Sequence, residues 1–205
     1  PTQKFNYLAV LRSLGQLWKS EPQVRGATLT QAMLFASFSV LWTVLPFWLA
    51  HRYDYGAGIT GTLAALGLIG ILCAPLAGSF SDRQGPFRMV VFGVILMLLA
   101  WTVFWRWNSI VGMVVGILLL DAGEQCVLIA NQHTIYSLRP DARNRLNTLF
   151  MCVMFIGGAC GSLTATWLWE TTHSWALISS AGGGLVIMGM LIAVRRKYSG
   201  PYSGT

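Results

Sequence analysis

Charged side chains are scarce in this chain. They make up 10% of its 205 residues, while hydrophobic residues make up 55%. A soluble domain usually has about 25% charged residues, so this chain has too few polar side chains to cover a water-soluble globule. The net charge of +7 does not indicate nucleic acid as a partner, because the basic residues stand in short segments between apolar runs. We predict a protein whose solvent is a lipid bilayer.

Motifs of metal binding and catalysis are also missing. The chain has four cysteines and three histidines: Cys73, Cys126, Cys152, Cys160, His51, His133 and His173. The cysteines form no C-x-x-C or C-x-x-H pattern, so neither a disulfide framework nor a zinc site is predicted, and the histidines are isolated in the sequence. No H-E-x-x-H or G-x-S-x-G string occurs either. We therefore expect no metal, no cofactor, no catalytic residue and no enzyme.

Long apolar runs are what the chain has instead. A hydrocarbon core of about 30 Å takes roughly 20 apolar residues in a helix to cross, and open strands would leave backbone groups unpaired in lipid. Six runs are long enough: Thr28–Ala50, Gly58–Phe80, Met89–Trp105, Ile110–Leu138, Leu146–Trp169 and Trp175–Val194. The predicted fold class is an all-α membrane protein with six transmembrane helices.

Lysine and arginine are distributed unequally between the two ends of these runs. Twelve of them flank one side, and two, Arg52 and Arg106, flank the other. The positive-inside rule places the basic side in the cytoplasm. An even number of spans then puts both termini there.

Apolar residues also recur at helical intervals ahead of the first run, at Leu8, Leu11, Leu14 and Trp18. This pattern predicts an amphipathic helix on the cytoplasmic membrane surface, which Glu21-Pro22 would end. The alternative is a disordered tether. The predicted organisation is a cytoplasmic amphipathic linker at 1–27, six membrane helices at 28–194 and a cytoplasmic basic tail at 195–205.

The most specific local string is GSFSDRQGPFR, which runs from Gly78 to Arg88 between the second and third apolar runs. It resembles the G-x-x-x-D-R-x-G-x-R loop signature of the major facilitator superfamily, whose fold has this loop between the second and third helices of a six-helix half. In that family the loop is an intracellular latch, which holds the two halves together while the central cavity opens outward. The resemblance implies that the latch residues here are Gly78, Asp82, Arg83, Gly85 and Arg88. The alternative is an ordinary turn whose arginines satisfy the positive-inside rule.

The resemblance extends over nearly the whole chain. The linker-like segment before the first run favours the second, C-terminal half of such a transporter. The strings DAGEQ from Asp121, RPDARNRLN from Arg139 and GGACGS from Gly157 resemble bacterial inner-membrane exporters of the arabinose-efflux and YnfM-like type. This implies half of a transporter fold, built as a 3+3 inverted repeat, which works with an N-terminal six-helix half in the bacterial cell inner membrane. Glu124 departs from the pattern, because an apolar residue is expected there.

Polar residues follow one face of the fourth run, at Asp121, Glu124, Gln125, Asn131 and Gln132. At 1.5 Å of rise per residue, Asp121 and Glu124 come close to the bilayer midplane. An ionised carboxylate costs roughly 2.5–3.5 kcal/mol there, so both acids are expected to face protein or a wet cavity. Their mutual repulsion would leave at least one of them protonated part of the time, as a proton-coupled transporter requires. The alternative is a pair of structural acids hydrogen-bonded to neighbouring helices.

The first and fifth runs add further candidates. The resemblance implies that the first and fourth helices of a half line the central cavity, which makes Gln31 a candidate substrate contact. A hydrogen bond from Gln31 to a neighbouring helix is the alternative. In the fifth run Gly157 and Gly161 are four residues apart, as small residues are in the second run, and this spacing predicts close helix packing.

The predicted function is transport of a small solute, as proton-coupled efflux by alternating access. The expected partners are the lipid bilayer, the N-terminal six-helix half, a small-molecule substrate and protons. Three alternatives stay open: a self-sufficient six-span homodimer that acts as a channel or carrier, a membrane enzyme, and an inactive truncated transporter fragment. The first residue, Pro1, suggests a fragment or a processed piece.

Overall fold

Long helices make up nearly all of the part of the chain that the structure describes. The computed structural model describes residues 14–16, 18–54, 58, 61–63, 85–107, 109–138 and 142–199, with side chains up to residue 197. The helices are α2 (Pro22–Tyr53), α5 (Pro86–Arg106), α6 (Ile110–Leu138), α7 (Arg143–Thr172) and α8 (Trp175–Ser199). All five are long and apolar enough to cross a membrane, and the described residues include no strand. An all-α membrane fold is therefore confirmed.

Five of the six predicted spans correspond to these helices, and the fourth has the predicted bounds. The second, Gly58–Phe80, lies almost entirely outside the described residues. Four helices, α2, α5, α7 and α8, extend beyond the predicted spans. α2 begins at Pro22, where proline has no helical N–H to lose, and α8 continues past Val194 to Ser199. The extensions of α2 and α8 carry basic residues, and exposed ones such as Arg52, Arg195 and Lys197 can reach the membrane surface with their long side chains.

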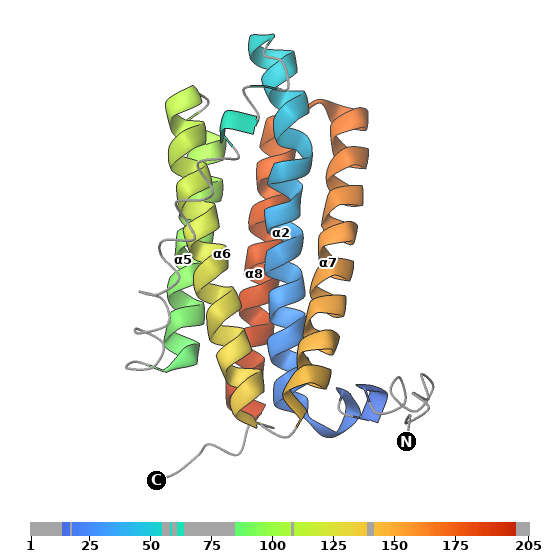
Figure 1. Cartoon of the computed structure of the whole chain (residues 1–205). Coiled ribbons are helices and arrows are strands. Elements are labelled where there is room, and N and C mark those ends of the chain that lie inside the picture. The colour runs from blue at the N-terminus through green and yellow to red at the C-terminus, as the bar shows by residue number, and fades with distance from the viewer. Residues whose placement is uncertain are drawn as a thin grey trace.

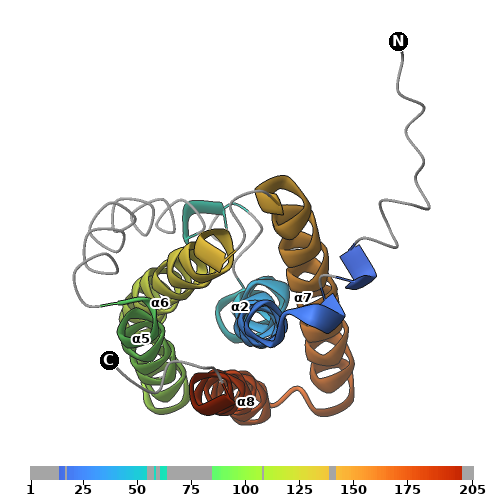
Figure 2. The same ribbon diagram turned by 90° about the horizontal axis from the view of Figure 1, so that it is seen from below.

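α2 occupies the middle of the bundle (Figures 1 and 2). It contacts α7 and α8 along much of its length and also touches α6, while α5 pairs with α6 and contacts α8. The centre is apolar: Leu41 and Leu45 of α2, Met97 and Phe104 of α5 and Ile117 of α6 are fully or almost fully buried. A central α2 is thus surrounded by helices that position its polar residues.

The outward face of α7 is apolar as well. Phe155, Leu163 and Trp167 are each more than half exposed. Water is a poor solvent for such a face, whereas lipid or another helical unit covers it at no hydrophobic cost. The exposed surface therefore agrees with a membrane environment.

α7 lies unusually close to α2, as the glycine spacing predicts. A Cβ atom added at Gly157 would overlap the backbone of Ala32, and one added at Gly161 would overlap the backbone of Ala36. Glycine allows the backbones of two helices to approach this closely. The predicted close packing of the fifth span is confirmed.

The charges of the described helices separate by end. One end, where α2, α5 and α7 begin and α6 and α8 finish, carries Arg25, Arg88, Arg143, Arg145, Arg195, Arg196 and Lys197. We call it the basic end; it is the lower end in Figure 1. The opposite end carries Arg52 and Arg106.

Candidate functional site

A group of polar side chains lies buried between α2, α6 and α8. Its members are Gln31 and Asn131 at 0% exposure, Glu124 at 4%, Asp121 at 6% and Arg196 at 9%. Gln31 comes from α2 and Arg196 from α8, while α6 supplies the other three. Burying such groups is costly unless they are hydrogen-bonded, so their partners determine what the site can do.

Three hydrogen bonds join four of these side chains. Gln31 Nε2 donates to Glu124 Oε1 over 2.6 Å. Asn131 Nδ2 donates to Gln31 Oε1 over 3.1 Å. Arg196 Nη1 donates to Asn131 Oδ1 over 3.0 Å. We call these four residues the polar chain; it joins α8 to α6 directly and α6 to α2 at two points.

Asp121 lies beside the polar chain without being part of it. Among the described residues, neither of its carboxyl oxygens has a hydrogen-bond partner, and the same holds for Glu124 Oε2 and for Trp42 Nε1. The Trp42 indole is close enough to act on the Asp121 carboxyl, although the pair does not have hydrogen-bond geometry. Buried polar atoms normally have partners. These carboxyl oxygens are therefore available to accept a proton or a donor from a ligand.

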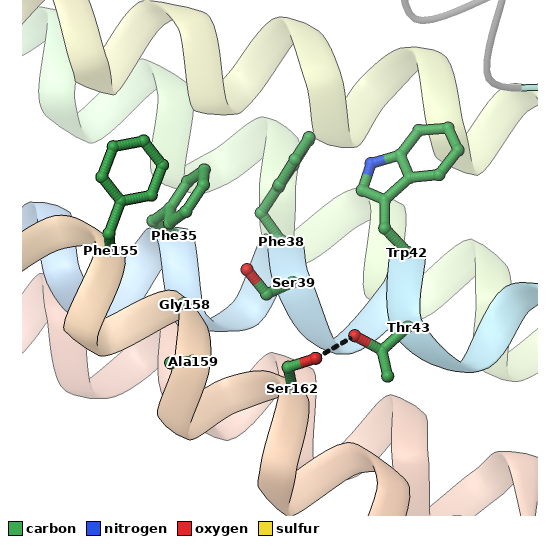
Figure 3. A pocket seen from close by; sticks show the side chains of 9 residues that line it. All are labelled: Phe35, Phe38, Ser39, Trp42, Thr43, Phe155, Gly158, Ala159 and Ser162. Carbon is green, nitrogen blue, oxygen red and sulfur yellow. Dashed lines mark hydrogen bonds between the residues drawn. The ribbon is translucent and has the colours of Figure 1, made fainter.

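A groove of about 320 Å³ lies between α2 and α7 (Figure 3). Aromatic rings form much of its wall. Phe35 and Phe38 of α2 stack with ring centroids 5.7 Å apart, and Phe155 of α7 meets Phe35 edge-on at 5.7 Å. Trp42 continues the aromatic row, with its ring 6.1 Å from that of Phe38. Because Trp42 lines the groove and also approaches Asp121, it connects the groove with the buried acids.

Hydroxyl groups provide the polar part of this groove. Thr43 and Ser162 lie on facing helices, and their hydroxyl oxygens are 2.6 Å apart in a hydrogen bond (Figure 3). Ser39 adds a third hydroxyl, and Gly158 and Ala159 leave space beside it. Rings and hydroxyls without a charged group suit a solute that is partly apolar and partly hydrogen-bonding.

A second groove, of about 580 Å³, opens at the basic end. Arg88, Arg196 and Lys197 line it, and the Lys197 ammonium lies 4.5 Å above the ring of Phe87. Gly85, at φ +86° just before α5, lies at its edge. Gly85 and Arg88 are the two predicted latch residues that the structure describes; Gly78, Asp82 and Arg83 lie outside the described residues.

Some of the remaining predicted site residues belong to the polar chain and others do not. The structure brings Gln31, Glu124 and Asn131 into direct contact. Gln125 and Gln132 are partly exposed and take no part in the polar chain. The hydrogen bond of Gln31 to a neighbouring helix, which the sequence left as an alternative, is present.

Sequence reasoning missed Arg196. It assigned this residue to a basic tail, whereas Arg196 belongs to α8 and is buried. Nothing in the sequence separates it from Arg195 and Lys197, which are exposed.

Two histidines that are isolated in the sequence lie near each other in the structure. The rings of His51 and His173 are 5.9 Å apart, beside Trp169. In the described part of the chain, no three His, Cys, Asp or Glu side chains gather where they could hold a metal ion.

The profile of the Major Facilitator Superfamily matches residues 27–203, which is most of the chain. The chain belongs to this superfamily. Its predicted family is thus confirmed.

Several named proteins are similar to the chain. YgaY of Escherichia coli (strain K12), described as an uncharacterized transporter, is 37% identical over 189 residues, which cover 91% of this chain and 48% of YgaY. SCO4007 of Streptomyces coelicolor, named as a transporter, is 28% identical over 91% of this chain and 44% of its own length. YceJ of Bacillus subtilis, named as an uncharacterized MFS-type transporter, is 24% identical over 88% and 46%. The chain therefore spans about half the length of the curated relatives that it matches.

Proposed function

We propose that this chain is the C-terminal half of a proton-coupled exporter of a small solute, which works by alternating access in the inner membrane of a bacterial cell. The observation that carries proton coupling is the pair of buried acids. Asp121 and Glu124 lie about one helical turn apart in α6, and three of their four carboxyl oxygens have no hydrogen-bond partner among the described residues.

Such a pair can exchange protons as the protein changes state. A protonated carboxyl is neutral and is tolerated in a medium of low dielectric constant, whereas a carboxylate needs water or hydrogen-bond donors. A cavity that opens alternately to the two sides of the membrane would give the acids water from one side at a time. Proton release on one side and proton uptake on the other would then be linked to solute movement.

The groove between α2 and α7 supplies the surface that we assign to the solute. Its aromatic wall and its hydroxyls come from α2 and α7, and Trp42 links it to Asp121. We infer that a bound solute and the Asp121 carboxyl influence each other through this tryptophan. A test is Ser162→Phe, which would fill the groove: the Michaelis constant for transport should rise, whereas Thr164→Phe, at an exposed position of the same helix, should leave it unchanged.

Two observations support the assignment as half of a transporter. The chain covers 44–48% of the length of YgaY, SCO4007 and YceJ. The face of α7 beside the groove is apolar and exposed, with Phe155 at 60%, and a second six-helix half would cover such a face. The latch residues Gly78, Asp82, Arg83, Gly85 and Arg88 would then contact that half from the basic end, which we place in the cytoplasm.

The acids are tested in the full-length protein as the cell makes it, reconstituted into lipid vesicles. Glu124→Gln and Asp121→Asn should each abolish accumulation driven by an imposed proton gradient, while solute exchange without a gradient continues. Glu170→Gln is the control, because Glu170 is an exposed acid near the far end of α7. Undiminished gradient-driven transport by both acid variants would remove α6 from proton coupling. Accumulation in inside-out but not right-side-out vesicles would support efflux.

Dependence on another half is a separate question. This chain is expressed with and without the coding segment upstream of it. Solute accumulation should change only when both parts are present. Transport by this chain alone would favour the self-sufficient homodimer instead.

A further inference from the structure

The side chain of Arg196 crosses α2 to reach Asn131, its partner in the polar chain. The backbones of α6 and α8 are not adjacent in the described part of the chain, so the side chain of Arg196 spans the distance between the two helices. Its aliphatic stem lies over Gly26 of α2, where an added Cβ atom would come within 2.8 Å of Cγ and 2.9 Å of Cδ. Glycine at this position makes room for the crossing. The guanidinium then donates to Asn131.

A guanidinium at one end gives the polar chain a fixed direction. Arginine has five N–H donors and no acceptor, so the Asn131 group that faces Arg196 must be the carbonyl oxygen. The Asn131 amide nitrogen is then left to donate to Gln31, and the Gln31 nitrogen is left to donate to Glu124. Amide orientations are ordinarily interchangeable, but here the arginine sets both of them. Glu124 Oε1 is thereby always an acceptor.

The direction decides where a proton can reside on Glu124. With Oε1 occupied by the Gln31 donor, the proton must bind Oε2, which has no hydrogen-bond partner among the described residues. If the side-chain amides of Asn131 and Gln31 were both rotated by a half turn, the oxygen of Gln31 would face Glu124. A protonated Glu124 could then donate its proton to Gln31 in a hydrogen bond. That arrangement would set the Asn131 NH₂ group against the Arg196 donors, where no hydrogen bond can form.

We propose that Arg196 is a positioning residue, which orients the amides of Asn131 and Gln31 so that Glu124 carries its exchangeable proton on Oε2, outside any hydrogen bond of the polar chain. This rests on the proposed proton exchange at Glu124. A proton that is not held in a hydrogen bond is released readily when water reaches it, so Arg196 keeps the acid ready for exchange without touching it.

Among the described residues, few other charged groups lie around Glu124. Asp121 is the acid that acts on it from α6, and α2 contributes the neutral Gln31. The charged residues of α5 and α7 stand near the ends of those helices: Arg88, Arg106, Arg143, Arg145 and Glu170. Arg196 is thus the cation that is hydrogen-bonded into the chain leading to Glu124.

The test uses infrared difference spectra of the full-length protein in lipid, recorded across a pH change. The carbonyl stretching band of protonated Glu124 is identified by its loss in Glu124→Gln. Arg196→Gln should move this band, because a neutral amide can also accept a hydrogen bond and lets the chain reverse. Arg196→Lys keeps a group that only donates and should leave the band in place. Arg195→Gln, the exposed neighbour, should also leave it in place.

Asn131→Asp provides a second test in case Arg196→Gln does not fold. An aspartate accepts from Arg196 in an ion pair but has no donor for Gln31, so Gln31 should turn and the band should move. An unmoved band in a folded Arg196→Gln or Asn131→Asp protein overturns this proposal alone. Absence of a Glu124 band at every pH where the protein is folded overturns the proposed proton exchange as well. Transport by Glu124→Gln under a proton gradient reports on the proposed function separately.

Discussion

Gln31 of α2 donates from Nε2 to Glu124 of α6, while its Oε1 accepts from Asn131, also of α6. One buried side-chain amide thus makes both hydrogen bonds. The amide group therefore satisfies a carboxyl oxygen and an amide nitrogen at once. Few other side chains have both a donor and an acceptor at this reach. The residue thus joins two helices and also transmits orientation along the polar chain.

Removing this amide should destabilise the protein. Gln31→Leu keeps most of the volume but leaves Glu124 Oε1 and Asn131 Nδ2 buried without partners. We expect the free energy of unfolding to fall by about 2–4 kcal/mol, because the cost of removing each of these two polar atoms from water is no longer offset by a hydrogen bond. The measurement is reversible unfolding in detergent or lipid. Gln125→Leu, at a partly exposed position of α6, is the control, and equal stability of the two variants would contradict the role of Gln31.

A second buried contact ties α2 to α5 and α8. Trp101 Nε1 donates to Ser37 Oγ over 2.7 Å, and Ser37 Oγ donates to the carbonyl of Gly182 over 2.9 Å. Ser37→Ala removes both bonds, which should lower the free energy of unfolding by about 1–2 kcal/mol. Ser180→Ala is the matched control, because Ser180 is exposed and bonds within its own helix to Ala176. A Ser37 variant as stable as the control would show that this contact carries no net stability.

The approach of α7 to α2 predicts a third result. Gly161→Ala places a Cβ atom on the Ala36 carbonyl, so the helices must separate or bend, which we expect to cost about 1–3 kcal/mol. Gly184→Ala is made in α8, where nothing lies within 4 Å, and it should stabilise slightly because alanine is the better helix former. The two variants are compared by thermal unfolding in the same detergent. A Gly161 variant that gains stability like the control would refute the close packing.

The sequence predicts the parts of this structure that depend on local chemistry. Apolar length gives α6 its bounds, because the run is limited by polar residues and Arg139-Pro140 on the chain itself. Glycine spacing likewise predicts the packing of α7, since Gly157 and Gly161 recur on one face whatever their partner. The polar face of α6 identifies Glu124 and Asn131 for the same reason.

The rest depends on which helices become neighbours, and this has no local signal. Arg196 looks like Arg195 in the sequence; only the crossing over Gly26 makes one buried and the other exposed. The aromatic groove needs Phe155 of α7 beside Phe35 of α2, two residues that are distant in sequence. Gln125 illustrates the opposite error: it stands next to Glu124 in the chain but points to a less buried part of the helix surface.

The distribution of charge predicts which way the bundle crosses the membrane. Arg143 begins α7 at the basic end and Arg106 closes α5 at the other, and both are exposed. In a background without native cysteines, Arg106→Cys and Arg143→Cys are labelled with a maleimide that cannot cross membranes. Because the positive-inside rule keeps arginine-rich ends in the cytoplasm, the thiol at position 106 should react in cells with an intact inner membrane. The thiol at position 143 should react only after that membrane is opened. The reverse pattern would place the basic end outside, and the groove at the basic end would then belong to the external surface and not to a cytoplasmic latch.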